Sequence, residues 1–132
     1  MNLFLRLIKK LAAAAAILWL TTAVTAEPEP EPEAPLPGIL RIHYHRNAND
    51  YQNYGLWLWD EVKKPSTDWP GGASTFSSKD NFGAYVDVEL LENAAQVGFL
   101  VVNLKTGEKE GGSKTVQITD KNEVWITEND DN

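Results

Sequence analysis

Two tryptophans, Trp57 and Trp59, are separated by one residue in the segment Gly55-Leu56-Trp57-Leu58-Trp59. On a β-strand, residues i and i+2 point to the same face about 6.5 to 7 Å apart, so the indoles stand side by side and the leucines face the other way. Leucine has no polar atom, whereas a buried indole N–H needs a partner. We therefore expect the leucines in the core and the tryptophans outside, as a flat apolar platform. The alternative is that the tryptophans fill the core and the leucines pack under a loop.

A flat apolar platform of this kind rarely occurs without a ligand. Nucleic-acid bases stack on aromatic surfaces but also need a basic groove, and quaternary ammonium groups need a cage of several rings. A pyranose ring has an apolar C–H face that can stack on an indole, and a rim of hydroxyls that form hydrogen bonds. Tandem tryptophans about one sugar spacing apart therefore favour two consecutive units of a polysaccharide as the ligand.

His43 and His45 form a second pair, because the same spacing puts both imidazoles on one face of a strand. A metal site would need a third and a fourth ligand, and the chain has no other histidine and no Asp or Glu at a recognisable spacing. We predict no metal site and no cofactor. We expect polar or structural roles beside the tryptophans, with His43 as a candidate carbohydrate contact.

Acidic residues are plentiful, but their arrangement does not indicate catalysis. Glycoside hydrolysis needs two carboxylates that face each other across a cleft, whereas a strand pair such as Asp87 and Glu89 points out from one face. The sequence contains no Ser/His/Asp arrangement, phosphate-binding loop or metal-ligand cluster. It also contains no cysteine, which excludes a thiol nucleophile, a thiolate metal site and a disulfide framework. We predict that the chain is not an enzyme.

Length and charge narrow the choice of partner. The 132 residues allow one domain, and the formal net charge of −7 becomes −10 without the first 26 residues, which hold three basic side chains and no acid. A chain with this negative charge repels phosphate backbones, which argues against a nucleic-acid partner. About a hundred residues bury a modest core with little room for a deep active site, so we expect a monomeric binding module.

Residues 1–26 resemble a secretory signal, with a basic start (Arg6, Lys9 and Lys10), an apolar stretch and small residues at Val24 and Ala26. We expect cleavage after Ala26 and a secreted or cell-envelope protein that does not contact the membrane after cleavage. The alternative is a retained anchor, but the uncharged stretch of about 16 residues is short of the roughly 20 that span a bilayer.

Residues 27–37 form a low-complexity linker of alternating glutamates and prolines. Proline favours extended polyproline II, and the glutamates repel one another. At about 3.1 Å per residue the segment reaches roughly 34 Å, so we expect a stalk that holds the folded unit away from what precedes it.

Residues 38–129 show the two-residue alternation of β-strands. Strands are expected at 40–45, 54–59, 84–88, 96–103, 114–118 and 123–127, with long loops at 63–79 and 104–113, a turn at 120–122, and an acidic tail at 130–132. Short strands with turn signals between them predict an all-β fold, a small sandwich of six to eight antiparallel strands.

Seven ordered segments of this unit resemble the pullulanase-associated domain, also called carbohydrate-binding module family 41. The resemblance covers about residues 38–129. The segments are Leu40-Arg41-Ile42-His43-Tyr44-His45-Arg46, Tyr51, Tyr54-Gly55-Leu56-Trp57-Leu58-Trp59, Trp69-Pro70-Gly71-Gly72, Asp80-Asn81-Phe82-Gly83-Ala84-Tyr85, Val97-Gly98-Phe99-Leu100-Val101 and Glu123-Val124-Trp125-Ile126.

The resemblance implies an immunoglobulin-like β-sandwich that binds α-1,4-linked glucans such as amylose, amylopectin, glycogen and pullulan without hydrolysing them. It also implies that Trp57 and Trp59 stack on adjacent glucose units. A lysine of the 103–114 loop, Lys109 with Lys105 as the alternate, would bind sugar hydroxyls. The acidic contact of the family would fall to Glu110 or Ser113.

Such domains usually stand at the front of long debranching enzymes. Two alternatives therefore remain beside a stand-alone module: an N-terminal fragment of a secreted pullulanase-type enzyme, and a stalked surface adhesion domain with a protein partner.

Overall fold

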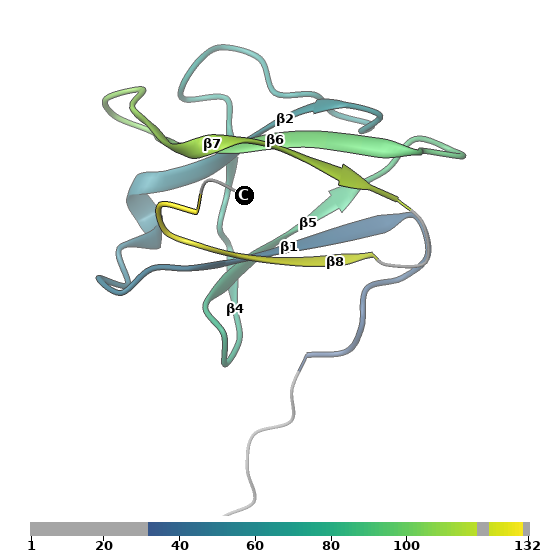
Figure 1. Ribbon diagram of the computed structural model, residues 1–132, viewed down its shortest axis with the longest axis horizontal. Helices are drawn as coiled ribbons and strands as arrows, with labels where there is room; N and C mark the ends of the chain where they lie inside the picture. Colours follow the sequence, from purple (N-terminus) through teal and green to yellow (C-terminus); the bar gives the residue numbers. More distant parts are fainter. Residues whose placement is uncertain (1–31, 119–121, 131–132) are drawn as a thin grey trace, which may run out of the picture. The chain divides into compact units, whose positions relative to one another are not determined.

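The computed structural model of the chain describes residues 32–118 and 122–130. This part is all-β, with eight strands and one short 3-10 turn (Figure 1). The elements are β1 (Ile39–His45), η1 (Tyr51–Asn53), β2 (Tyr54–Asp60), β3 (Ser74–Thr75), β4 (Ser78–Lys79), β5 (Ala84–Glu89), β6 (Gln96–Asn103), β7 (Lys109–Gln117) and β8 (Glu123–Thr127). The prediction of a small β-sandwich is confirmed.

The strands form two four-stranded sheets that pack face to face (Figure 1). One, here called the β1 sheet, has the order β4-β5-β1-β8, and the other, the β2 sheet, has the order β3-β2-β6-β7. All pairings are antiparallel except that of β1 with β8, which is parallel. The expectation of purely antiparallel strands therefore fails at this pair, because β8 enters beside β1 after the chain has crossed over from the β2 sheet.

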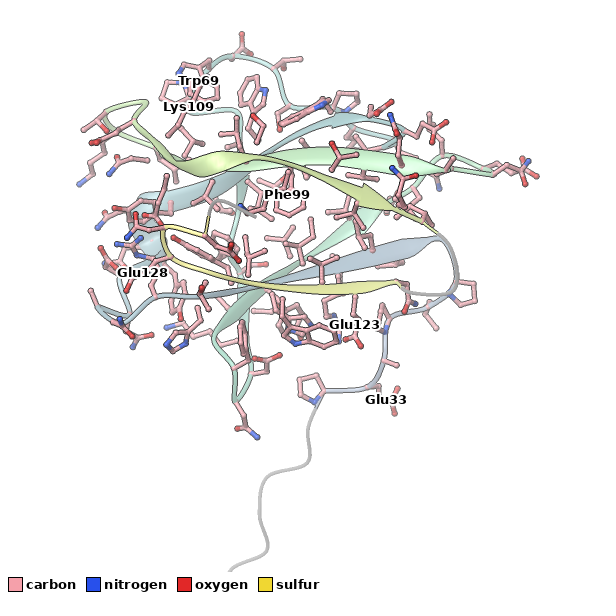
Figure 2. All side chains as sticks on the ribbon, viewed as in Figure 1. Glu33, Trp69, Phe99, Lys109, Glu123 and Glu128 are labelled. Atoms are coloured by element: carbon pink, nitrogen blue, oxygen red, sulfur yellow. The ribbon has the colours of Figure 1, made fainter. Side chains whose placement is uncertain are left out.

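The core lies between the sheets and is built from alternate residues of the long strands. Leu56 and Leu58 are 0% and 3% exposed and belong to this core, as the alternation predicted. Phe99, on β6, is fully buried at the centre of the layer (Figure 2). Burial of each such side chain contributes about 1.5 to 3 kcal/mol of hydrophobic free energy.

The outward residues of β1 are more buried than their alternation predicted. Arg41 and His43 are 8% and 4% exposed. Arg41 donates from Nε and Nη2 to the Asp87 carboxylate at 2.7 and 3.0 Å, and its guanidinium lies 4.4 Å from the ring centre of Tyr85. Paired charges and neighbouring rings therefore bury polar side chains that would otherwise face water.

One end of the sandwich is closed by an arginine. Arg46 is 9% exposed, donates to Asp50 at 2.7 Å and to the Tyr44 hydroxyl at 2.9 Å, forms an ion pair with Glu110, and lies 3.8 Å over the Tyr54 ring. The Tyr44 hydroxyl in turn donates to Glu110. Burial, and then this hydrogen bond, raise the pKa of Tyr44 well above its ordinary value.

The last part of the Glu/Pro segment contacts the folded unit. Arg41 Nη1 donates to the Glu33 carbonyl at 2.7 Å, and Asn122 Nδ2 donates to the Pro35 carbonyl at 3.1 Å. Pro35 is buried. The segment therefore contacts the domain at Glu33 and Pro35. The expected signal, the start of the stalk, the tip of the 120–122 turn and the end of the acidic tail lie outside the described residues. Within the described residues, no helix has the length and apolar character needed to cross a membrane.

Candidate carbohydrate-binding site

Trp57 and Trp59 lie on the outward side of the β2 sheet. In the register of β2 with β6 they stand opposite Leu100 and Gly98, and they pack against a small apolar cluster of Ala73, Leu100, Val102 and Leu104 that is separate from the main core. Both tryptophans are half-buried. The tryptophans lie on the side of the strand that the alternation predicted. They are, however, less exposed than the flat platform that the sequence led us to expect.

Gly98 sets the position of the Trp59 ring. A methyl group at position 98 would overlap the indole of Trp59. The indole therefore lies directly over the β6 backbone, in space that any larger residue would fill. This close approach explains why an apolar central strand carries a glycine here.

A third tryptophan, Trp69, reaches this surface from the loop after β2. Its ring centre is 4.9 Å from that of Trp57, with 66° between the ring planes, and it is 43% exposed. Ser66 holds the loop beside β2, because its amide donates to the Leu58 carbonyl at 2.8 Å and its hydroxyl accepts from the Leu58 amide at 2.9 Å. The rings of Trp57 and Trp69 therefore face in different directions.

The turn that carries Trp69 is closed by local hydrogen bonds. The Gly72 amide donates to the Asp68 carbonyl at 2.8 Å, and the Ala73 amide donates to the Pro70 carbonyl at 3.2 Å. A methyl group at Gly72 would overlap the Thr67 carbonyl. The loop is therefore a built turn rather than an open connection.

Lys109 begins β7 and is exposed on the same side of the sheet, opposite Val102. Its ammonium lies 5.7 Å from the ring centre of Trp69 (Figure 2). The loop before it is held by Asn103, whose side-chain oxygen accepts from the Lys105 and Thr106 amides at 2.9 and 3.1 Å. Lys105 is exposed at this turn, so Lys109 is the lysine that the structure brings to the tryptophans.

Two other candidate contacts lie elsewhere. Glu110 follows Lys109 on the strand, so it faces the other side and binds Tyr44 and Arg46 between the sheets. His43 lies on the β1 sheet, where its ring stacks on Trp125. Ser113, the alternative to Glu110 for the acidic contact of the family, is exposed on β7. No group of three or more His, Cys, Asp or Glu side chains in the described stretches could hold a metal ion.

The surface formed by Trp57, Trp59, Trp69 and Lys109 is here called the tryptophan face. It combines three indole rings with one flexible ammonium group that can donate hydrogen bonds. Its chemistry is that of a shallow apolar surface with a polar edge, which suits a ligand with apolar faces and hydrogen-bonding rims.

Comparison with known proteins identifies the family. Residues 38–132 match the bacterial pullanase-associated domain. The chain belongs to this family. Within it, the module is 39% identical over 92 residues to pullulanase A of Streptococcus pneumoniae, a match that covers 65% of this chain and 7% of that protein.

Two solved structures are similar to the module. One, described as alpha-glucan recognition by family 41 carbohydrate-binding modules from streptococcal virulence factors, is 34% identical with a TM-score of 0.68, over 75% of this chain and 48% of that one. The other, described as alpha-glucan binding by a streptococcal virulence factor, is 37% identical with a TM-score of 0.62, over 70% and 45%. The match therefore falls on carbohydrate-binding modules, and the chain spans under half the length of these relatives.

The sequence pattern did not single out Trp69 or Gly98 as parts of the site. Trp69 lies in a loop without periodicity, so nothing local indicates which surface it reaches. Gly98 offered a signal, because a glycine inside an otherwise apolar strand often marks a close approach of another group.

Proposed function

We propose that the module binds α-1,4-linked glucans such as amylose, amylopectin, glycogen or pullulan, without catalysing their hydrolysis. The ligand lies on the tryptophan face. Trp57 and Trp59 each stack on one glucose unit, and Lys109 donates hydrogen bonds to sugar hydroxyls.

The observation that carries the proposal is the pair of outward indoles beside the angled ring of Trp69. Two rings that share a strand face are about 6.5 to 7 Å apart, which suits neighbouring units of one chain. The 66° between the Trp57 and Trp69 planes makes the surface bent rather than flat. A curved α-1,4 chain follows such a surface, whereas the straight ribbon of a β-1,4 chain does not.

The two similar solved structures support this ligand class, because they are described as alpha-glucan recognition and alpha-glucan binding. The proposal concerns the module alone. In pullulanase A the corresponding segment is a small part of a much larger enzyme, and an adhesive role with a protein partner is the competing function.

Affinity electrophoresis tests the proposal. We expect amylopectin or pullulan in the gel to retard the protein, and we expect cellulose not to retain it in a pull-down. Leu91→Ala is the matched control, because Leu91 is also a large apolar residue, 46% exposed, outside the tryptophan face. Unchanged mobility in every α-glucan gel would contradict the glucan function and favour the adhesive one.

The proposed setting is secreted or cell-envelope, with the chain cleaved after Ala26. Mass spectrometry of the exported protein should find Glu27 as the first residue. A retained segment 1–26 would favour a membrane anchor instead.

A further inference from the structure

A pocket lies on the outward side of the β1 sheet, across the sandwich from the tryptophan face. It has a volume of about 230 Å³. Figure 2 shows Trp69 and Lys109 beyond the β2 sheet, and Glu33 and Glu123 on the side of the β1 sheet. The residues that line the pocket include Trp125, His43, Asp80, Phe82, Glu123 and the linker residue Pro32.

Trp125 is the most exposed aromatic residue of the described chain, at 53%. Its indole stacks on the imidazole of His43, with ring centres 4.9 Å apart and planes within 6° of parallel. This contact covers one face of the indole and fixes its orientation. Trp125 also lines the pocket, so part of its remaining exposed surface faces the pocket.

The floor of the pocket is polar. His43 Nε2 lies 3.1 Å from Glu123 Oε1, and Nδ1 lies 2.8 Å from Asp80 Oδ2 without hydrogen-bond alignment, so this buried nitrogen has no hydrogen-bond partner among the described residues. Asp80 is held by the amides of Phe82 and Gly83, at 2.9 and 3.1 Å. The Glu123 side chain is 28% exposed and presents its carboxylate to the pocket.

We propose that this pocket, here called the Trp125 pocket, is a second carbohydrate-binding site that takes one glucose unit of an α-glucan. The apolar face of the sugar stacks on Trp125, and its hydroxyls donate to Glu123. The inference rests on the proposed function in that it names the same class of ligand.

Size and chemistry favour a sugar over an organic cation. The pocket is smaller than the roughly 300 to 1,000 Å³ of sites for drug-sized ligands, which fits a single ring. Quaternary ammonium groups are recognised by cages of several aromatic faces, whereas of the aromatic residues that line this pocket only Trp125 is strongly exposed. Carboxylate oxygens accept but do not donate, and sugar hydroxyls supply the donors that they need.

The location gives the second site a distinct consequence. A short oligosaccharide cannot reach both sites, because they lie on outward faces of different sheets. One module would therefore bind two glucan segments at once and bring branches of a polysaccharide together, which increases avidity without any new contact.

The test is a nuclear magnetic resonance titration of the indole N–H signals with maltotriose. We expect the Trp125 signal, assigned with Trp125→Phe, to shift and saturate in the millimolar range. The same shift and dissociation constant should appear in the double variant Trp57→Ala/Trp59→Ala. Glu123→Gln should weaken the Trp125 response about tenfold, the size expected for loss of a charged hydrogen bond. Leu91→Ala should leave every response unchanged, and a parallel titration with N-acetyl-lysine methylamide supplies the cation.

The outcomes separate the two proposals. If the signals of Trp57, Trp59 and Trp69 shift and that of Trp125 does not, the second site is wrong and the glucan function stands. If the cation shifts Trp125 and maltotriose does not, the pocket recognises cationic groups and the sugar assignment is overturned. If no indole signal responds to maltotriose, both proposals fail.

Discussion

The two outward faces of the sandwich expose aromatic residues for opposite reasons. On the β2 sheet, the β6 partners of Trp57 and Trp59 are Leu100 and Gly98, which offer the rings no polar group. On the β1 sheet, the cross-strand neighbours of Arg41 and His43 include Asp87, Glu123 and Trp125, so charge pairs and a stacked ring bury polar groups. The tryptophan face is apolar at Trp57 and Trp59 because the neighbouring β6 residues carry no polar side chains. The Trp125 pocket is polar because the neighbouring segments supply carboxylates.

The largest expected effect is the loss of α-glucan binding when the tryptophans of the β2 sheet are replaced. Trp57→Ala or Trp59→Ala should weaken α-glucan binding about 5- to 150-fold, because each removes a stacking surface of about 1 to 3 kcal/mol, by analogy with bases stacked on aromatic rings. The double variant should show no retardation in amylopectin gels. Because both rings are half-buried, each change should also lower the free energy of unfolding by about 1 to 2 kcal/mol, measured by urea denaturation. Full retardation of the double variant would remove the tryptophan face from the proposed function.

Replacing the core between the faces should show the reverse pattern. Phe99→Ala should lower the free energy of unfolding by about 3 to 5 kcal/mol, because it leaves a cavity at a fully buried site. Glucan affinity of the folded fraction should stay within about twofold of the original protein, since Phe99 points away from the tryptophan face. A variant that remains stable but loses binding would mean that the ligand depends on the Phe99 side of the β2 sheet and not on the tryptophan face.

A single methyl group should weaken the tryptophan face without unfolding the domain. Gly98→Ala places a methyl group where the Trp59 indole lies, so the ring must move away from β6. We expect about tenfold weaker glucan binding, because a displaced ring loses most of one stacking contact. Gly71→Ala is the control, since a methyl group there meets nothing within 4 Å. Equal affinities for the two variants would show that the position of the Trp59 ring does not matter for binding.

The smallest expected effect affects both faces together, because Tyr44 links β1 to Glu110 on β7. The folded protein raises the pKa of Tyr44 above its unfolded value of about 10. The stabilising contribution is therefore fully present below about pH 10 and is lost as the pH rises toward the folded pKa, at up to about 1.4 kcal/mol per pH unit. Thermal unfolding from pH 9 to 11 measures it. Tyr44→Phe should flatten this alkaline dependence, and an unchanged slope in Tyr44→Phe would assign it to another group.

Much of the tryptophan face could be read along the chain. The alternation in β2 correctly separated Leu56 and Leu58 from Trp57 and Trp59, because a strand turns successive side chains to opposite faces and leucine has no polar atom to satisfy. The strand signals likewise predicted the sandwich, since short apolar stretches between turn residues must pair in order to bury their inner faces. These conclusions depend on residues that are neighbours in sequence.

What only the tertiary structure decided depends on residues far apart in the chain. Trp69 joins Trp57 because the Ser66 hydrogen bonds fold the loop back along β2. Glu110 points inward because it binds Arg46 and Tyr44 between the sheets. These partners precede it in the sequence by 64 and 66 residues. His43 lies in the opposite sheet because β1 pairs with β5 and β8 and not with β2, and the parallel pairing of β8 places Trp125 against it. Local alternation assigns a side chain to a face of its strand, but the partner strands determine what else that face contains.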